Sequence, residues 1–218
     1  MPVICTGRNI KEIQSIIEIT GIDTLITENG SYIKHHQTIR IENIRKKVIK
    51  ELVDLANQLG DAVGFRNANG VAVTKINKYT RNCYGGYFKW AKVDPYYYLK
   101  KPINFLNVFT DGGDVQKYRD AFKDELAIIQ NDPHVLDINR ADVSKATGIQ
   151  DVLTDFHWNG LPTYCFGDAY NDIPMFKKVQ HSVAMANADD KCKQRADHVT
   201  DSNNDNGIAH GLRYYHLI

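Results

Sequence analysis

The chain has 218 residues with 27 basic and 26 acidic side chains, so its formal net charge is only +1. That balance gives no electrostatic reason to expect nucleic acid or a membrane surface as a partner. No apolar run approaches the length of about 20 residues that a membrane span needs, and the N-terminus lacks the pattern of a secretory signal. We expect a globular protein with a substantial core, built as one large domain or two small ones.

The four cysteines lie far apart in the sequence and include no Cys-x-x-Cys pair. Two of them, Cys5 and Cys165, fall in apolar, strand-like runs. This pattern favours buried free thiols in a reducing cytosol over disulfides or a zinc site, so we expect a cytoplasmic protein.

The start of the chain alternates between strand and helix patterns. An apolar strand at residues 2–5 leads into a turn at residues 6–9, and isoleucines at helical spacing come next, with Asn9 as N-cap and Gly21 as C-cap. A second strand at residues 23–27 closes on an Asn-Gly turn. Strand, helix and strand in so short a stretch predict a βαβ unit and hence a parallel sheet.

The pattern changes in the middle of the chain. It predicts one long amphipathic helix over residues 41–59, another helix over 118–129, and strands at 71–73, 106–109 and 134–138. Residues 79–98 are rich in aromatic side chains and indicate irregular structure. The tyrosines at 96–98 fit either the lining of a substrate entrance or packing at a domain interface. The whole block has the size of a small α+β domain inserted into the first.

The alternation of strands and helices returns after residue 143. The pattern predicts helices at residues 145–155, 173–179, 189–195 and 207–216 and strands at 161–166, 182–185 and 198–200. The polar run at residues 201–207 has the composition of a calcium loop. It lacks the ligand spacing and the closing glutamate of an EF-hand, so we favour a surface turn before the last helix.

The clearest chemical signal lies at the carboxyl end of the predicted strand at residues 161–166. Gly167 ends the strand, and Asp168, Asn171 and Asp172 come directly after it. Open α/β sheets present their sites at the carboxyl ends of strands, and oxygen ligands placed there suit Mg²⁺, which takes one or two carboxylates and keeps several waters. Helix capping by the same side chains is the alternative, and we favour the functional interpretation.

Two further groups admit both a functional and an ordinary interpretation. Thr6, Gly7 and Arg8 place a hydroxyl and a flexible turn before a helix, which makes an anion-binding corner, but a plain helix cap explains them equally well. Lys145 stands at the start of a predicted helix, and taken alone it is an ordinary solvated side chain.

Taken together, these segments resemble the haloacid dehalogenase superfamily, specifically its Cof-type phosphatases with a C2 cap. ICTGRN is similar to the family's second motif, ITENGSYI to its Asn-Gly segment and VSKATGIQDVL to its lysine-bearing third motif. FGDAYNDIPMF resembles the fourth motif, and HSVAMANA and ADHVTDSNNDNGIA resemble the run after it. The matches stand in family order over residues 1–36 and 140–218, and their combination is specific although each piece alone is weak.

The resemblance implies an α/β fold with a Rossmann-like parallel-sheet core, formed by residues 1–37 and 140–218, and an inserted α+β cap domain at residues 38–139. It also implies a Mg²⁺-dependent phosphatase that hydrolyses small phosphate monoesters, such as sugar phosphates, through an aspartyl-phosphate. The expected partner is a small phosphorylated metabolite, with no nucleic acid and no membrane. The sequence leaves the oligomeric state and the identity of the substrate open.

Residue roles come from the same resemblance. Lys145 would hold phosphate and nucleophile through its charge, and Asp172 would support Lys145 and the metal shell. The implied phosphate-binding residues are Thr6, Gly7, Lys145 and Asn171, and the implied metal ligands are Asp168 and Asp172.

The family's first motif, Asp-x-Asp-Gly-Thr, does not occur in the sequence. Thr6 already belongs to the second motif, and Asp111-Gly112 comes after Val-Phe-Thr inside the middle block. The nucleophile, the general acid/base, one metal carboxylate and the first core strand are therefore missing from residues 1–218. We expect a truncated phosphatase that is inactive or impaired, in preference to a degenerate relative, because the other motifs are present. A non-catalytic phosphate-binding relative and a phosphomutase are the alternatives.

Overall fold

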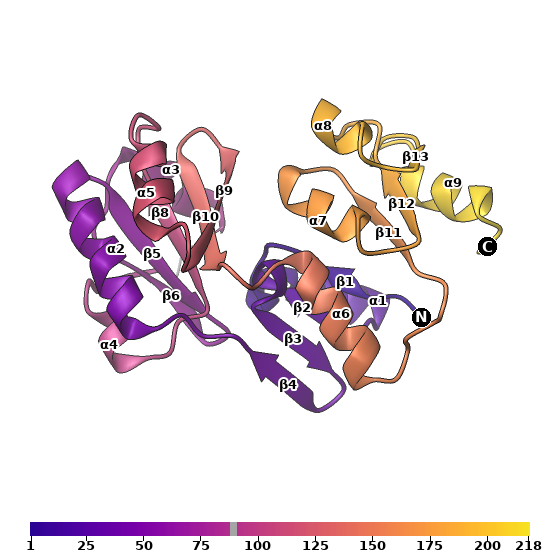
Figure 1. Ribbon diagram of the computed structural model, residues 1–218, viewed down its shortest axis with the longest axis horizontal. Helices are drawn as coiled ribbons and strands as arrows, with labels where there is room; N and C mark the ends of the chain where they lie inside the picture. Colours follow the sequence, from indigo (N-terminus) through magenta and orange to yellow (C-terminus); the bar gives the residue numbers. More distant parts are fainter. Residues whose placement is uncertain (88–90) are drawn as a thin grey trace. The chain divides into compact units, whose positions relative to one another are not determined.

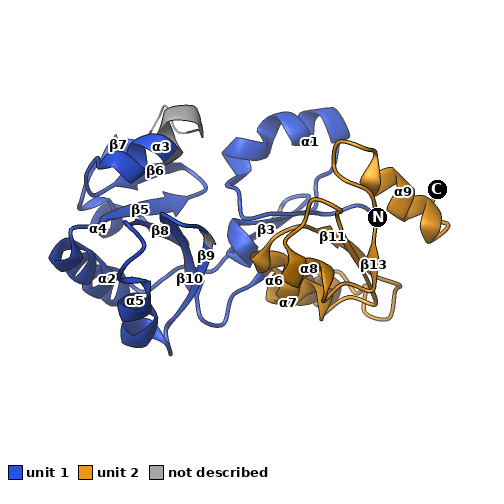
Figure 2. Ribbon diagram, turned by 90° about the horizontal axis from the view of Figure 1, so that it is seen from above, with its two compact units in different colours: residues 1–144 blue, residues 145–218 orange. Residues whose placement is uncertain are grey.

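The structure, a computed structural model, describes the backbone of residues 1–87 and 91–218 and the side chains there except those of residues 38, 83–87 and 131. The sequence predictions for Cys83 and for the aromatic side chains at 84–90 lie outside these residues. The chain forms two compact units, Met1–Ser144 and Lys145–Ile218 (Figure 2). Among the described helices, none has both the length and the apolar character to cross a membrane.

A four-stranded sheet with the order β1-β2-β3-β4 opens the first unit. Its elements are β1 (Ile4–Cys5), the 3₁₀ helix η1 (Ile10–Ile13), α1 (Gln14–Thr20), β2 (Leu25–Thr27), the 3₁₀ turn η2 (Glu28–Gly30), β3 (Tyr32–His35) and β4 (Thr38–Ile41). Strands β1 and β2 pair in parallel, which confirms the predicted βαβ unit. The sequence analysis missed the antiparallel pairing of β2, β3 and β4.

The helix caps and the turn in this segment are the predicted ones. The Asn9 side chain accepts the N–H of Lys11, and Gly21 ends α1 in the left-handed conformation with φ of 67°. The Asn-Gly turn also has positive φ, at Asn29 and Gly30, and the left-handed conformation begins one residue earlier, at Glu28. The chain therefore reverses sharply at the carboxyl end of β2.

A six-stranded sheet with the order β7-β6-β5-β8-β10-β9 forms the rest of the first unit (Figure 1). Its strands are β5 (Ala62–Asn67), β6 (Gly70–Val73), β7 (Lys92–Val93), β8 (Phe105–Phe109), β9 (Leu126–Asp132) and β10 (Val135–Arg140), and the helices of this part are α2 (Lys46–Leu59), α3 (Lys78–Tyr87), α4 (Tyr97–Lys100) and α5 (Val115–Phe122). Helices α2 and α5 contribute Leu52 and Tyr118 to a buried core with Phe65, Leu106 and Leu136 of the strands. One face of the sheet is therefore sealed by these two helices.

Several predictions for this part of the chain are wrong. Residues 126–129 belong to β9, so the helix predicted over 118–129 ends at Phe122. The helix predicted from residue 41 begins at Lys46. Where the structure describes residues 79–98, they belong largely to α3, β7 and the start of α4 instead of irregular structure. Tyr98 is buried in the core, whereas Tyr96 is exposed, which favours packing as the role of Tyr98.

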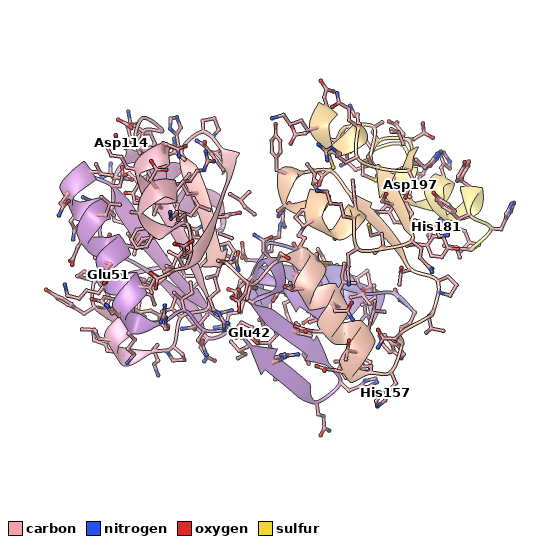
Figure 3. The ribbon with its side chains drawn as sticks, viewed as in Figure 1. Glu42, Glu51, Asp114, His157, His181 and Asp197 are labelled. Carbon is pink, nitrogen blue, oxygen red and sulfur yellow. The ribbon has the colours of Figure 1, made fainter. Side chains whose placement is uncertain are left out.

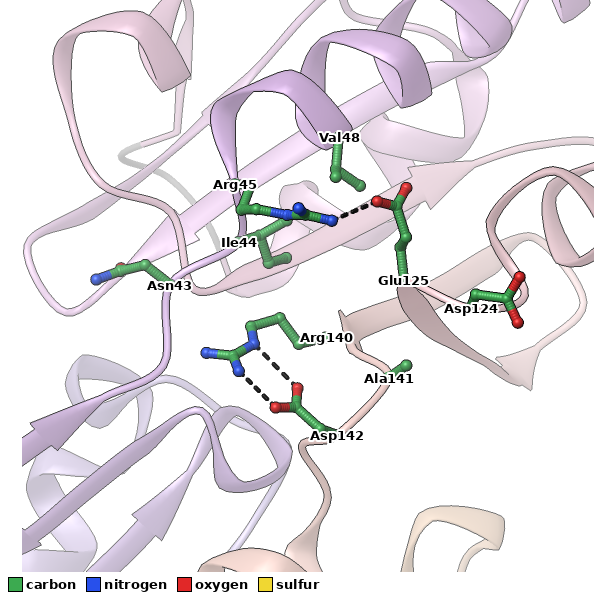
Figure 4. A pocket seen from close by; sticks show the side chains of 9 residues that line it. All are labelled: Asn43, Ile44, Arg45, Val48, Asp124, Glu125, Arg140, Ala141 and Asp142. Atoms are coloured by element: carbon green, nitrogen blue, oxygen red, sulfur yellow. Dashed lines mark hydrogen bonds and ion pairs between the residues drawn. The ribbon is translucent and has the colours of Figure 1, made fainter.

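Charged side chains gather where the chain passes from β4 to α2 and where it leaves β10. A hollow of about 460 Å³ is found there, and Figure 4 shows the ion pairs beside it. Arg140 Nη1 donates to Glu42 Oε2 at 2.5 Å, and Arg140 Nε donates to Asp142 Oδ1 at 3.0 Å. Arg45 pairs with Glu125 in the same hollow, and Glu42 is labelled in Figure 3. Arg140 thus ties together the two chain segments that border the six-stranded sheet.

The second unit keeps the predicted alternation of strands and helices. Its elements are α6 (Lys145–Asp155), β11 (Tyr164–Gly167), η3 (Tyr170–Asp172), α7 (Ile173–Phe176), β12 (His181–Ala184), α8 (Asp190–Lys193), β13 (His198–Val199) and α9 (Gly207–Tyr214). The three strands are parallel and in chain order. The polar run before α9 is a turn, as predicted.

The two units together make a mixed α/β fold with parallel strands, as the sequence analysis predicted. Cys192 is a buried thiol, as predicted, whereas Cys5 and Cys165 are only half-buried, so the predicted burial is wrong for these two. The division into core segments 1–37 and 140–218 and a cap at 38–139 stays a prediction.

Candidate active site

The carboxyl end of β11 carries the residues that the sequence analysis singled out. Gly167 closes the strand, and its carbonyl oxygen accepts the N–H of Met185 at 3.0 Å. The carbonyl oxygen of Asp168 accepts the N–H of Asp189, also at 3.0 Å. The segments after β11 and β12 therefore lie side by side, and they place Asp168 and Asp189 at the same end of the sheet.

Lys145 and Asp172 form a buried ion pair in this unit. Lys145 Nζ lies 2.5 Å from Asp172 Oδ1, and the two residues are 5% and 3% exposed. The second oxygen, Oδ2, accepts the N–H groups of Asp168 at 2.9 Å and Ala169 at 3.1 Å. A buried charge is tolerated only when it is paired and hydrogen-bonded, and Asp172 meets both conditions. Lys145 is thus not the solvated side chain that its position alone suggested.

Gly167 is required for this arrangement. A Cβ atom on Gly167 would lie 2.6 Å from Asp172 Cβ and 2.8 Å from Asp172 Oδ2. The end of β11 and the turn η3 can therefore approach closely only because residue 167 has no side chain. The sequence analysis assigned Gly167 no role beyond ending the strand.

Asp168 has an exposed carboxyl group in an electrostatically unfavourable place. Partial burial by the surrounding protein raises the pKa of Asp168. The Asp172 and Asp189 carboxylates raise it as well, whereas Lys145 lowers it. A cation bound here would relieve the repulsion between the carboxylates. Asp189, which comes after Ala-Asn-Ala beyond β12, was missed because nothing in its local sequence points to a site.

Cys192 lies near the same carboxylates but is not a reactive thiol. It is fully buried, and burial together with Asp172, Asp168 and Asp189 raises the pKa of Cys192 to about 11. The thiol therefore stays protonated at neutral pH, which excludes it as a nucleophile.

Asn171 lies in η3, between Asp168 and Asp172. The unit thus brings Lys145, Asp168 and Asp172 together and holds Asn171 in the same turn. Within the residues that the structure describes, no group of three or more His, Cys, Asp or Glu side chains is arranged to hold a metal ion.

Thr6 and Gly7 lie in the other unit, in the turn after β1. Thr6 Oγ1 accepts the N–H of Arg8 at 3.2 Å, and Thr6 N–H donates to the carbonyl oxygen of Ile26 at 2.8 Å. The next helix is capped by Asn9, as predicted for that residue, so helix capping is not the role of Thr6, Gly7 or Arg8. A role for Thr6 and Gly7 in binding phosphate stays a prediction.

The chain matches one protein family over nearly its whole length. The family of haloacid dehalogenase-like hydrolases matches residues 1–212. The chain belongs to this family, as the motifs in its sequence predicted.

Relatives from Bacillus subtilis (strain 168) carry phosphatase names. The chain is 28% identical over 218 residues to 5-amino-6-(5-phospho-D-ribitylamino)uracil phosphatase YcsE, and the match covers 99% of this chain and 82% of that protein. It is 25% identical over 251 residues to phosphatase YwpJ, covering 97% of this chain and 86% of that protein. By family resemblance, the chain is a phosphatase.

Solved structures agree with this fold. BT1666 from Bacteroides thetaiotaomicron, described among phosphatases of the superfamily, superposes with a TM-score of 0.88 at 26% identity, over 99% of this chain and 82% of that one. The subclass IIB sugar phosphatase BT4131 gives a TM-score of 0.89 over 99% and 85% of the two chains. At 21% identity, the second likeness shows the fold alone.

Proposed function

We propose that the protein acts on small phosphate monoesters with the help of Mg²⁺, and that the phosphate is carried by a sugar or polyol. The substrate class is supported by the name of the relative YcsE, whose substrate bears a phosphorylated ribityl chain. The observation that carries the proposal is the buried pair of Lys145 and Asp172 directly behind the exposed carboxyl of Asp168. A fixed cation and a free carboxylate at one strand end suit an anionic substrate bound together with a metal.

The donor set at the end of β11 fits Mg²⁺. The Asp168 side chain is exposed at the end of β11, and the pKa of its carboxyl group is raised first by partial burial and then by the charges of Asp172 and Asp189, so a bound cation would favour its ionised form. Mg²⁺ commonly takes one or two carboxylates and completes its shell with water and substrate phosphate. Asp168 would be the direct ligand and Asp172 would act through Lys145 and the backbone. When bound, the ion would neutralise charge on the phosphoryl group.

The side chains of this chain would bind and orient the substrate. Lys145 would attract a phosphoryl oxygen while Asp172 holds its ammonium group in place. Asn171, in the same unit, would donate a hydrogen bond to a phosphoryl oxygen. In the first unit, the hydroxyl of Thr6 stays a predicted phosphate donor. Such interactions stabilise the negative charge that spreads over the phosphoryl oxygens in the transition state.

The aspartate nucleophile of the family's reaction has no assigned residue here. No Asp-x-Asp-Gly-Thr run occurs in residues 1–218, so we assign substrate binding and charge stabilisation to this chain but no covalent step. The missing run is also compatible with the second candidate function, a protein that binds phosphate compounds but does not turn them over. Phosphate binding is expected in both cases.

The experiment is an assay of residues 1–218 with a panel of sugar phosphates and Mg²⁺, run beside a calorimetric titration. We expect binding of sugar phosphates, no binding of the same sugars without phosphate, and little or no release of inorganic phosphate. Robust turnover would contradict the view that residues 1–218 lack the nucleophile. Equal affinity for the sugars with and without phosphate would contradict the proposed function.

A further inference from the structure

A buried carboxylate lies where the two sheets of the first unit meet. Glu28 is 0% exposed and stands at the carboxyl end of β2, in the left-handed conformation. Its Oε1 accepts the side-chain N–H of Asn9 at 2.7 Å, and its Oε2 accepts the side-chain N–H of Asn104. Arg66 Nε lies 3.9 Å from Oε1. Burial raises the pKa of Glu28, while Arg66 and the two amides act in the opposite direction.

The partners of Glu28 come from both sheets. Asn9 belongs to the segment after β1, whereas Arg66 lies near the end of β5 and Asn104 precedes β8. Asn9 also donates to the carbonyl oxygen of Asn67 at 3.0 Å, and Arg66 pairs with Glu12. The carbonyl oxygen of Glu28 accepts the side-chain N–H of Asn139 at 2.8 Å. Glu28 is therefore bonded to strand ends across the six-stranded sheet.

The backbone beside Glu28 holds the turn that contains Thr6. The N–H of Asn29 donates to the carbonyl oxygen of Thr6 at 3.1 Å, and the N–H of Glu28 donates to the carbonyl oxygen of Arg8 at 3.1 Å. These two bonds lie on either side of Gly7. A displacement of Glu28 would therefore displace the turn on both sides of Gly7.

A buried carboxylate such as that of Glu28 is not needed to stabilise a fold. Taking the charge out of water costs free energy, and an apolar side chain of similar size often does as well. Polar clusters of this kind fix one arrangement of the groups they join, because any other arrangement leaves a buried charge without partners. The Glu28 cluster therefore holds the six-stranded sheet and the turn after β1 in one fixed geometry.

We propose that Glu28 is a positioning residue for phosphate binding: its carboxylate, held by Asn9 and Asn104, fixes the Thr6–Arg8 turn relative to the six-stranded sheet. The inference rests on the proposed function, because it takes this turn to bind phosphate. Since coupling is reciprocal, phosphate bound at the turn also stabilises the Glu28 cluster.

The test compares two buried carboxylates. Glu28→Gln keeps the shape, but its amide has a single oxygen, so it can accept the N–H of only one of Asn9 and Asn104 and turns its own N–H₂ group toward the other. Asp61→Asn is the matched control, because Asp61 is buried in the same unit and its carboxylate accepts the hydroxyl of Tyr118 in α5. Each variant is titrated with inorganic phosphate in calorimetry, and the amide resonances of Thr6, Gly7 and Arg8 are followed by NMR.

We expect Glu28→Gln to weaken phosphate binding about tenfold, as the loss of charge-assisted hydrogen bonds predicts. The resonances of the turn should shift without phosphate present. Asp61→Asn should change the affinity less than about twofold, since its loss does not reach the turn. The double variant Glu28→Gln, Asn104→Asp restores an amide–carboxylate hydrogen bond with the roles reversed, and it should recover most of the affinity.

Asn104→Ser keeps Glu28 and removes one donor, so it serves if Glu28→Gln does not fold. It should also weaken phosphate binding and shift the turn resonances. If the wild type binds phosphate and Glu28→Gln or Asn104→Ser binds it equally well, with unchanged turn resonances, the inference is overturned while the proposed function stands. If the wild type binds no phosphate, the proposed function fails and the inference falls with it.

Discussion

At the scale of single residues, two charged groups, Lys145 and Asp172, are buried as an ion pair. Gly167 leaves the space that Asp172 occupies. Asp172 accepts two backbone N–H groups and the Lys145 ammonium, and it lies against Gly167. Asp168 stays exposed beside it. The buried groups thus order the end of β11 and leave one carboxylate available to solvent.

Gly167→Ala tests the close approach of β11 and η3. The added methyl group would overlap with Asp172 Cβ, so we expect a loss of about 1–3 kcal/mol in the free energy of unfolding. Urea denaturation measures it. Gly160→Ala is the control, because its Cβ meets nothing within 4 Å and only the positive φ of 88° opposes it. A smaller loss at position 167 than at 160 would contradict the steric argument.

Lys145→Met tests the buried ion pair. Removing one partner leaves the Asp172 charge buried without a counter-charge, and breaking such a pair typically costs about 3–5 kcal/mol. Lys117→Met breaks an exposed pair with Asp114 and should cost about 0.5 kcal/mol or less in the same urea experiment. Because Lys145 opposes the rise in the pKa of Asp168, that pKa should rise further in Lys145→Met. Equal losses in the two variants would show that the buried pair stabilises the fold no more than an exposed one.

The pH dependence of stability tests another buried carboxyl group. Burial raises the pKa of Asp61, while the Tyr118 hydroxyl, which donates to Asp61 Oδ2 at 2.7 Å, acts against the rise. A raised pKa means that the folded state holds the proton more tightly, so stability is lost as the pH rises from the unfolded pKa through the folded one.

Tyr118→Phe removes the donor that stabilises the ionised form of Asp61. The free-energy difference between wild type and variant should therefore grow as the pH rises from about 4 through the pKa of Asp61, and then level off. Urea denaturation at a series of pH values measures this. A difference that does not change with pH would mean that the hydrogen bond does not favour the charged carboxylate.

At the scale of elements, local sequence patterns predicted the helix caps and the parallel pair of β1 and β2, but not the antiparallel pairing of the other strands. Leu126 and Ile129 continue the helical spacing of Tyr118 and Phe122, yet they belong to β9. Residues 126–132 pair with β10 along its whole length, and this tertiary contact outweighs the local period. The spacing of apolar residues every three to four positions does not show that a later strand, here β10, will pair with the segment.

The β3–β4 hairpin was missed because its turn carries no Asn-Gly or Gly signal. His36 takes the left-handed conformation there, with φ of 51°. Its ring lies against His35, and its Nδ1 pairs with Asp23. The turn is thus stabilised by contacts that the local turn residues alone do not reveal.

Gly21→Ala tests the cap of α1. Gly21 has φ of 67° and nothing lies within 4 Å of an added Cβ, so the cost is conformational, about 1 kcal/mol. Gly21→Asn is the control, because asparagine adopts the left-handed conformation more readily and should lose less. Thermal unfolding of both variants checks the order. An alanine variant as stable as the wild type would contradict the capping argument.

At the scale of the whole molecule, the motifs predicted the family and the α/β fold, and they drew Lys145, Asp168 and Asp172 into one site. They did not predict the Glu28 cluster, because its partners are remote in sequence. Asn104 lies 76 residues from Glu28, and nothing local marks Asn104 or Arg66 as its partner. Contacts between distant strand ends depend on the arrangement of the sheets, which local patterns do not encode.

The most direct test of the proposed site is a calorimetric titration of inorganic phosphate, with and without Mg²⁺, into the wild type and Asp168→Asn. We predict that the wild type binds phosphate, that Mg²⁺ strengthens the binding, and that Asp168→Asn loses the Mg²⁺ effect. The variant should keep its unfolding temperature, because Asp168 is exposed. Absence of phosphate binding by the wild type, or a Mg²⁺ effect that survives Asp168→Asn, would contradict the assignment of this site.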